Sequence, residues 1–216
     1  MECEGAGPAS LTVARDLAPL GYHVTVFDQD PKAGGMIRTQ IPRFRLPEEV
    51  IDEETGYVLG LGVEFRGGVR IESLKSLLAE KFDAVFIGSG APRGRDLNVP
   101  GRKEASKKIH VGIDWLASVS FGHVTSVGRR VIVLGGGNTA MDCCRTAKRL
   151  GATEAVIVYR RTREKMPAHD FEVEEALQEG VMVKWLSTIK RSGDAGALTI
   201  EKMVLDAHGN PQPTGE

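Results

Sequence analysis

The chain has 216 residues, of which 41% are hydrophobic and 26% charged, so its composition is that of a globular protein with one or two domains and an ordinary core. Because 28 Lys and Arg residues nearly balance 29 Asp and Glu residues, the formal net charge of −1 gives no electrostatic reason to bind nucleic acid or an anionic membrane. No apolar run reaches the length of a membrane span and no signal peptide is visible, so we expect a cytoplasmic protein with no membrane or nucleic-acid partner.

A glycine-rich turn near the N-terminus matches the pattern G-x-G-x-x-G, with Gly5, Gly7 and the small Ser10 in the three marked places. A helix is predicted from about residue 9 to residue 20, followed by an alternating strand that ends in Asp28. An acid at this distance holds a ribose diol and repels a 2′-phosphate. This first site therefore suits FAD or NAD rather than NADP.

The strand that normally precedes such a turn is not evident. Only four largely polar residues stand before Gly5, where several apolar residues would be usual. We therefore expect the chain to begin inside the motif.

The middle of the first half carries a second pair of glycines, Gly34 and Gly35, which suits a backbone lying close to a ligand. Proline and two acids at 47–49 are good first-turn residues for a helix. The predicted elements after the glycine pair are a helix over 47–61, a strand over 63–66, a helix over 71–81 and a buried strand over 83–91 that ends in a turn of small residues.

A turn-rich and charged stretch over residues 98–108 predicts a crossing between two domains, with the boundary after residue 100. A helix over 111–118 follows. The next motif is an apolar strand, a glycine turn and a helix opening near Thr139, with Gly135, Gly137 and Ala140 in the pattern G-x-G-x-x-A. Its turn would let a pyrophosphate approach the backbone, with the helix N-terminus facing the anion. We therefore predict a second dinucleotide site here, the alternative being a turn that only joins strand to helix.

The strand after this motif ends in Arg160 and Arg161, with Arg163 as a third cation. Arginine at this point accommodates the 2′-phosphate of NADP, whereas an acid would select NAD. The sequence therefore favours NADPH, although a solvated strand end would show the same charges.

The remaining residues carry few signals of chemistry. Glu172 or His169 could approach the nicotinamide ribose through the loop over 166–168, although a solvated helix face explains Glu172 and the glutamates after it more simply. The adjacent Cys143 and Cys144 read as buried helix residues, and no C-x-x-C is present. Strands are predicted over 181–186 and 199–206, followed by a loop, and further strands of a doubly wound domain are missing.

Five runs together carry a family resemblance: Gly-Ala-Gly-Pro-Ala at 5–9, Gly-Gly-Met-Ile-Arg with Ile-Pro-Arg-Phe-Arg-Leu-Pro at 34–47, Phe-Ile-Gly-Ser-Gly-Ala at 86–91, Gly-Gly-Gly-Asn-Thr-Ala-Met-Asp at 135–142, and Val-Tyr-Arg-Arg-Thr-Arg-Glu-Lys-Met-Pro-Ala at 158–168. They resemble the small (β) subunit of NADPH-dependent glutamate synthase. They are also similar to the flavin half of dihydropyrimidine dehydrogenase and to the larger subunit of NADH-dependent ferredoxin:NADP oxidoreductase.

The resemblance implies an α/β fold of the two-dinucleotide-binding-domain flavoprotein type, in which a Rossmann-like FAD domain carries an inserted NADPH domain. Residues 1–100 would then be an incomplete FAD domain and residues 101–216 the NADPH domain, with the chain truncated at both ends. The residues implied to line FAD are Gly5, Gly7, Ser10, Asp28, Gly35, Arg38 and Ala91. Those implied to hold NADPH are Gly136, Gly137, Asn138, Thr139, Arg160 and Arg161, beside Gly135 of the motif.

The function implied by the resemblance is transfer of a hydride from NADPH to FAD and of electrons onward to iron–sulfur centres of a larger partner subunit or domain. No side chain need act as acid or base, so no catalytic residue is predicted, and no metal site is expected. The alternative is a nucleotide-binding module without flavin that serves as a docking or sensing domain. A disulfide reductase of the thioredoxin reductase type is disfavoured because C-x-x-C is absent.

Overall fold

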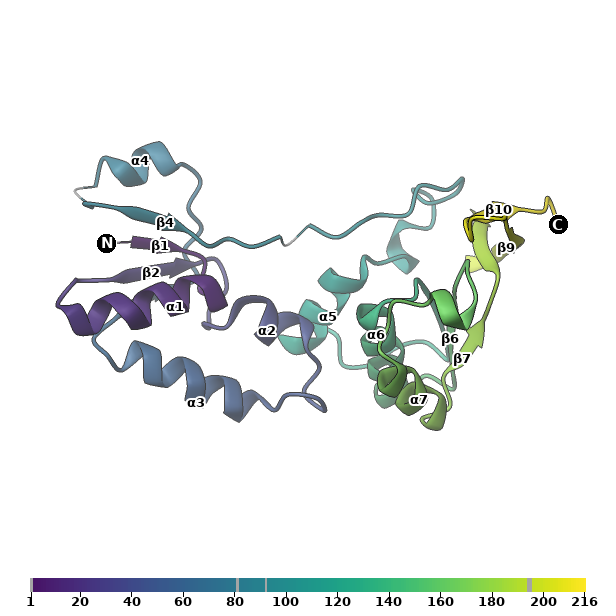
Figure 1. Ribbon diagram of the computed structural model, residues 1–216, viewed down its shortest axis with the longest axis horizontal. Coiled ribbons are helices and arrows are strands. Elements are labelled where there is room, and N and C mark those ends of the chain that lie inside the picture. Colours follow the sequence, from purple (N-terminus) through teal and green to yellow (C-terminus); the bar gives the residue numbers. More distant parts are fainter. Residues whose placement is uncertain (1, 81, 92, 194–195) are drawn as a thin grey trace. The chain divides into compact units, whose positions relative to one another are not determined.

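A computed structural model describes residues 2–80, 82–91, 93–193 and 196–216, and the chain divides into two compact units, residues 1–93 and 94–216 (Figure 1). The sequence-based boundary after residue 100 lies inside the second unit. The assignment of one cofactor to each unit stays a prediction.

The first unit is built on a parallel four-stranded sheet in the order β3-β2-β1-β4. Its strands are β1 (Glu2–Glu4), β2 (Thr25–Asp28), β3 (Glu64–Gly67) and β4 (Val85–Ile87). Its helices are α1 (Pro8–Leu17), a 3₁₀ turn η1 (Ala18–Leu20), α2 (Gly35–Gln40), α3 (Glu48–Leu59) and α4 (Leu74–Leu78).

The core of this unit lies where α1 packs on β1 and β2 and is flanked by α3. Val24, Val26, Leu11 and Ala14 are all buried there. Pro8 at the first turn of α1 supports the helix start, since its missing N–H would have no intrahelical partner in any case. The sheet and helix thus place the first glycine turn at the carboxyl end of β1.

Three predictions for this unit need correction. The strand before Gly5 is present, because Glu2 pairs in parallel with both Thr25 and Val85 despite the polar sequence. The predicted helix over 71–81 shrinks to α4, which starts only where the side chain of Ser73 caps it. The strand predicted as buried over 83–91 is the short β4, and Ile87 is 54% exposed because β4 lies at the sheet edge.

The second unit combines a parallel sheet in the order β5-β6-β7 with an antiparallel sheet in the order β10-β9-β8. Its strands are β5 (Arg130–Leu134), β6 (Glu154–Val158), β7 (Met182–Lys184), β8 (Ser187–Ser192), β9 (Leu198–Leu205) and β10 (Pro211–Pro213). Its helices are α5 (Gly112–Ser120), α6 (Asn138–Arg149) and α7 (Asp170–Gln178), with 3₁₀ turns η2 (Ser106–Lys108) and η3 (Arg163–Lys165).

Helix α6 packs on β5 and β6 and is flanked by α5 and α7 (Figure 1). Met141, Cys144 and Ile157 are buried in this core, as is Val173 of α7. The strand–turn–helix order predicted from the second glycine motif is therefore present, and its helix packs in the core of the unit.

Ion pairs also join α6 to α7. The guanidinium of Arg145 contacts the carboxylates of Glu175 and Glu179 at 2.7 Å each, and Arg149 reaches Glu179 at 2.5 Å. Hydrogen bonds from Arg149 and then Arg145 lower the pKa of Glu179 to about 2. The glutamates of α7 are thus not one solvated face: Glu172 is only 1% exposed, so that prediction was wrong for it.

The C-terminal part also differs from the prediction. β8 was not predicted, and residues 211–213 form β10 rather than a loop, since they pair antiparallel with β9. Within the described ranges, the structure holds no helix that is both long and apolar enough to span a membrane.

Candidate nucleotide-binding site

The second glycine turn joins β5 to α6 and leaves a backbone surface open. Apart from its chain neighbours and the backbone of its own helix, no described residue has an atom within 4 Å of the place where a Cβ on Gly137 would lie, and α6 has no acid in its first turn. Among the described residues, the N–H groups of Gly136, Gly137, Asn138 and Thr139 have no hydrogen-bond acceptor. Free N–H groups at a helix N-terminus favour an anion, so this turn fits a pyrophosphate.

Two backbone contacts hold a second segment against this turn. The N–H of Ala168 donates to the carbonyl of Gly136 at 3.1 Å, and the N–H of His169 donates to Oδ1 of Asn138 at 3.2 Å. The loop over 166–169 therefore lies beside the glycine turn, as the hypothesis for His169 and Glu172 requires. Their role toward a nucleotide remains a prediction.

The three arginines after β6 are in different situations. Arg163 forms an ion pair with Asp170 at the start of α7. Arg160 is exposed and Arg161 is half-buried, and neither guanidinium has a hydrogen bond or ion pair with any residue that the structure describes. Arg160 and Arg161 are therefore the cations available for a phosphate, whereas Arg163 is already engaged.

The first glycine turn is tightly packed at two of its glycines and open at the third. Gly5 has φ of +87° and lies so close to Gly88 that a Cβ would sit 2.7 Å from its carbonyl oxygen. Gly35 has φ of +52°, and a Cβ there would sit 2.7 Å from Cα of Gly7. The side of Gly7 where a Cβ would project is open to at least 4 Å. Both glycine runs thus converge on one turn, which requires glycine at Gly5 and Gly35.

The predicted ribose ligand Asp28 lies at the end of β2 and already accepts two backbone hydrogen bonds. They come from Ala6 within the turn at 2.5 Å and from Asp30 at 2.8 Å. A carboxylate has about four lone-pair sites, so Asp28 can still accept from a ribose hydroxyl. The contact with Ala6 ties the acid to the glycine turn.

Three other predicted FAD residues have different surroundings. Ser10 is fully buried, and a Cβ on Gly88 would collide with its hydroxyl, so Ser10 packs α1 against the residue that follows β4. Arg38 is 2% exposed and donates to the carbonyl of Ala33 and to the carboxylates of Glu48 and Asp52. Ala91 is exposed beyond the end of β4.

The cysteines are not placed for redox chemistry. Cys143 and Cys144 are free and buried within α6, and burial raises the pKa of the Cys143 thiol to about 12. A thiol with such a pKa is protonated and unreactive near neutral pH. Their prediction as buried helix residues is confirmed.

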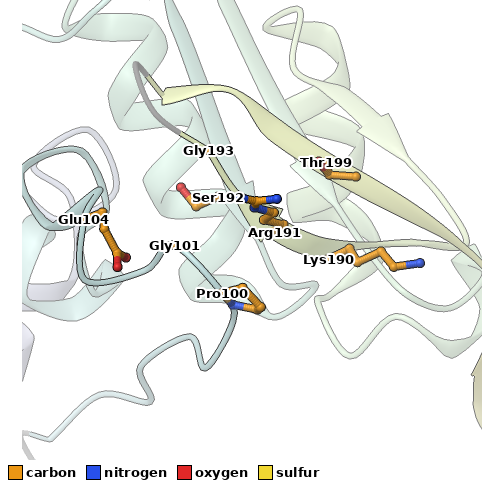
Figure 2. Close-up of a pocket in the computed structure, with 8 residues that line it drawn as sticks. All are labelled: Pro100, Gly101, Glu104, Lys190, Arg191, Ser192, Gly193 and Thr199. Atoms are coloured by element: carbon orange, nitrogen blue, oxygen red, sulfur yellow. The ribbon is translucent and has the colours of Figure 1, made fainter.

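A cavity of about 600 Å³ lies elsewhere in the second unit, between Pro100 and Gly101 on one wall and β8 and β9 on the other (Figure 2). A backbone hydrogen bond joins the two walls, because the N–H of Ser192 donates to the carbonyl of Pro100 at 2.9 Å. Neither glycine turn nor the free arginines line this cavity.

The order of these parts along the chain matches a known family over nearly its whole length. The family model for pyridine nucleotide-disulphide oxidoreductases matches residues 5–210. The chain belongs to this family. Both glycine turns lie within the matched residues. The predicted resemblance to glutamate synthase small subunits is confirmed by sequence similarity.

Two curated relatives are similar to nearly the whole chain. It is 38% identical over 218 residues to the NADPH-Fe(3+) oxidoreductase subunit beta of Geobacter sulfurreducens, covering 98% of this chain and 32% of the relative. It is 35% identical over 228 residues to the glutamate synthase [NADPH] small chain of Azospirillum brasilense, covering 97% of this chain and 47% of the relative. The chain thus spans about a third to about half of the length of these relatives.

A solved structure has the same fold. FprA from Mycobacterium tuberculosis, determined in complex with NADPH, superposes with a TM-score of 0.77 at 17% identity, covering 100% of this chain and 67% of FprA. The predicted α/β fold of the flavoprotein type is confirmed by this likeness together with the family match.

Proposed function

We propose that the chain is the NADPH-oxidising part of a flavoprotein electron-transfer enzyme, with FAD held by the first unit and NADPH by the second. The bound pair supplies transfer of a hydride, that is two electrons and one proton, from the nicotinamide to the flavin. The electrons would then pass one at a time to iron–sulfur centres of a larger partner subunit or domain. The names of the relatives support this reading, since both are subunits or chains of NADPH enzymes.

The pair of free arginines beside an open glycine turn is the observation that carries the NADPH assignment. Arg160 and Arg161 follow β6 after one intervening residue, and β6 pairs with β5, which leads into the turn. A guanidinium is a planar fork that matches a phosphate, so each unengaged arginine can take two oxygens of a 2′-phosphate.

The fit of the first unit to FAD rests on the shape of its turn. The open side of Gly7 admits a pyrophosphate, and Asp28 beside it can accept from a ribose hydroxyl while repelling a 2′-phosphate. The chain's own residues would bind and orient the two nucleotides, and none of them needs to donate or accept a proton.

The NADPH assignment is tested by replacing Arg160 and Arg161 together with alanine and measuring NADPH and NADH affinity by calorimetry. Each charged hydrogen bond is worth about 1.5–3 kcal/mol, so NADPH should bind at least about tenfold more weakly while NADH changes little. The matched control is Arg163→Ala, which removes a guanidinium already paired with Asp170. An equal loss for both nucleotides would refute the 2′-phosphate reading.

The flavin assignment is tested by an anaerobic visible spectrum of the chain with added FAD, before and after NADPH. Bleaching of bound flavin supports two working sites. If FAD does not bind while NADPH does, the proposal is wrong for this chain and the flavin-free docking or sensing module is favoured.

A further inference from the structure

Tyr159, the residue immediately after β6, lies beneath the second glycine turn. It is 6% exposed, and a Cβ on Gly136 would lie 2.5 Å from two carbons of its ring. The ring also meets Trp185 edge to face, with centroids 6.3 Å apart and planes at 78°. The ring is therefore packed between the turn and the core.

The backbone of Tyr159 is fixed at both of its polar atoms. Its N–H donates to the carbonyl of Lys184 at 2.9 Å, and its carbonyl accepts from the N–H of Ser187 at 3.0 Å. The position of the ring is thus set by the sheet itself, so that the turn rests on a rigid support.

The hydroxyl of Tyr159 reaches across the arginine-bearing segment. It donates to the carbonyl of Lys165 at 2.6 Å. The residues between these two points, 160–164, include Arg160 and Arg161, so one hydrogen bond closes the segment that carries both free cations.

The same segment is fastened to the glycine turn at its far end. Ala168 donates to Gly136 and His169 to Asn138, a few residues beyond Lys165. Tyr159 therefore contacts the turn with its ring and the arginine segment with its hydroxyl.

We infer that Tyr159 is a positioning residue that sets the preference for a 2′-phosphorylated nucleotide by fixing the arginine segment relative to the glycine turn. The inference rests on the NADPH site proposed above. A nucleotide that contacts both the turn and the arginines binds more tightly when the distance between the two is already fixed, because less of the protein must be ordered on binding. A nucleotide without the 2′-phosphate contacts only the turn and gains little.

The test is Tyr159→Phe, which keeps the ring beneath Gly136 and removes only the hydroxyl. Calorimetric dissociation constants are measured for NADPH and for NADH, beside the melting temperature. Loss of this one hydrogen bond should weaken NADPH binding about three- to tenfold, which corresponds to about 0.7–1.4 kcal/mol. NADH should bind within about twofold of the parent. Tyr57→Phe is the matched control, because its hydroxyl binds Glu53 on the exposed face of α3.

The outcomes separate this inference from the proposed function. If the double arginine variant loses NADPH selectively and Tyr159→Phe leaves the NADPH-to-NADH ratio unchanged, the NADPH site stands and the role of Tyr159 is wrong. A lower melting temperature with equal loss of both nucleotides also overturns it, since that is ordinary structural support. If the double arginine variant shows no selectivity, the proposed NADPH site fails first and the inference fails with it.

Discussion

Replacing Gly136 and Gly137 in turn by alanine should separate stability from binding at the second glycine turn. A Cβ on Gly136 would lie 2.5 Å from Cδ2 and Cε2 of Tyr159, whereas carbon atoms in contact prefer about 3.5–4.0 Å. The ring must move by about 1 Å, which is the gap between those two distances. Overpacking of this kind costs about 1–3 kcal/mol.

Gly137 is the matched control, because the same methyl group would meet no atom of a non-neighbouring described residue within 4 Å. Gly137→Ala should therefore cost less than about 1 kcal/mol, mostly from the weaker N-cap preference of alanine. It should nonetheless weaken NADPH binding, since the new methyl group would fill the space left for the pyrophosphate.

The assay is urea unfolding followed by tryptophan fluorescence, since Trp185 contacts Tyr159 directly, together with NADPH calorimetry on both variants. Gly136→Ala should lower the free energy of unfolding, whereas Gly137→Ala should change mainly the affinity. Equal stability of the two variants, or a greater loss of stability in Gly137→Ala, would refute the reasoning from packing.

Three further results are expected. Gly35→Ala should weaken FAD binding, measured by flavin fluorescence, because the new Cβ would lie 2.7 Å from Gly7 at a positive φ; unchanged FAD affinity would contradict the convergence of the two glycine runs. The pKa of Glu179 is lowered to about 2, so its ion pairs stabilise the fold above pH of about 4.3 and lose this effect as the pH falls towards 2. Glu179→Gln should therefore flatten the acid limb of a curve of unfolding free energy against pH. An unchanged acid limb would contradict this role of the ion pairs. Burial raises the pKa of Cys143 to about 12, so at pH 8 iodoacetamide should label Cys143 and Cys144 only after denaturation, as read by peptide mass spectrometry; rapid labelling of the folded chain would show that they are accessible.

The second glycine turn could be predicted from sequence because its signals are local. A glycine cluster between an apolar run and a helix opening leaves few alternatives, and α6 starts at Asn138, one residue before the expected Thr139. The strand β1 could not be predicted, since Glu2–Glu4 is polar and is held by pairing with strands on both sides. Backbone pairing of this kind has no signature in side-chain hydrophobicity.

The burial and hydrogen-bond partners of a single charged residue are harder to predict, as Arg38 and Glu172 show. Sequence reasoning treated Glu172 as part of a solvated face, but the packing of α7 against α6 buries it. The resemblance implies that Arg38 lines FAD, which stays a prediction, and the structure shows its guanidinium hydrogen-bonded to Glu48, Asp52 and the carbonyl of Ala33. The two carboxylates are ten or more residues away in the sequence and the third partner is a backbone carbonyl, so no local sequence pattern predicts these contacts.

Tyr159 shows why a positioning residue escapes sequence reasoning altogether. In the sequence it is one more aromatic residue at the end of a strand, where aromatics are common. Its hydroxyl partner is a backbone carbonyl, which every residue carries, and its ring partner is a glycine, which has no side chain to suggest a contact. Some of the nucleotide contacts proposed for this chain use residue types with distinctive chemistry, such as the paired arginines, and so can be predicted from a sequence. The contacts that position those residues are made to backbone atoms, as those of Tyr159 to Lys165 and Gly136 are, and can therefore be recognised only in the folded structure.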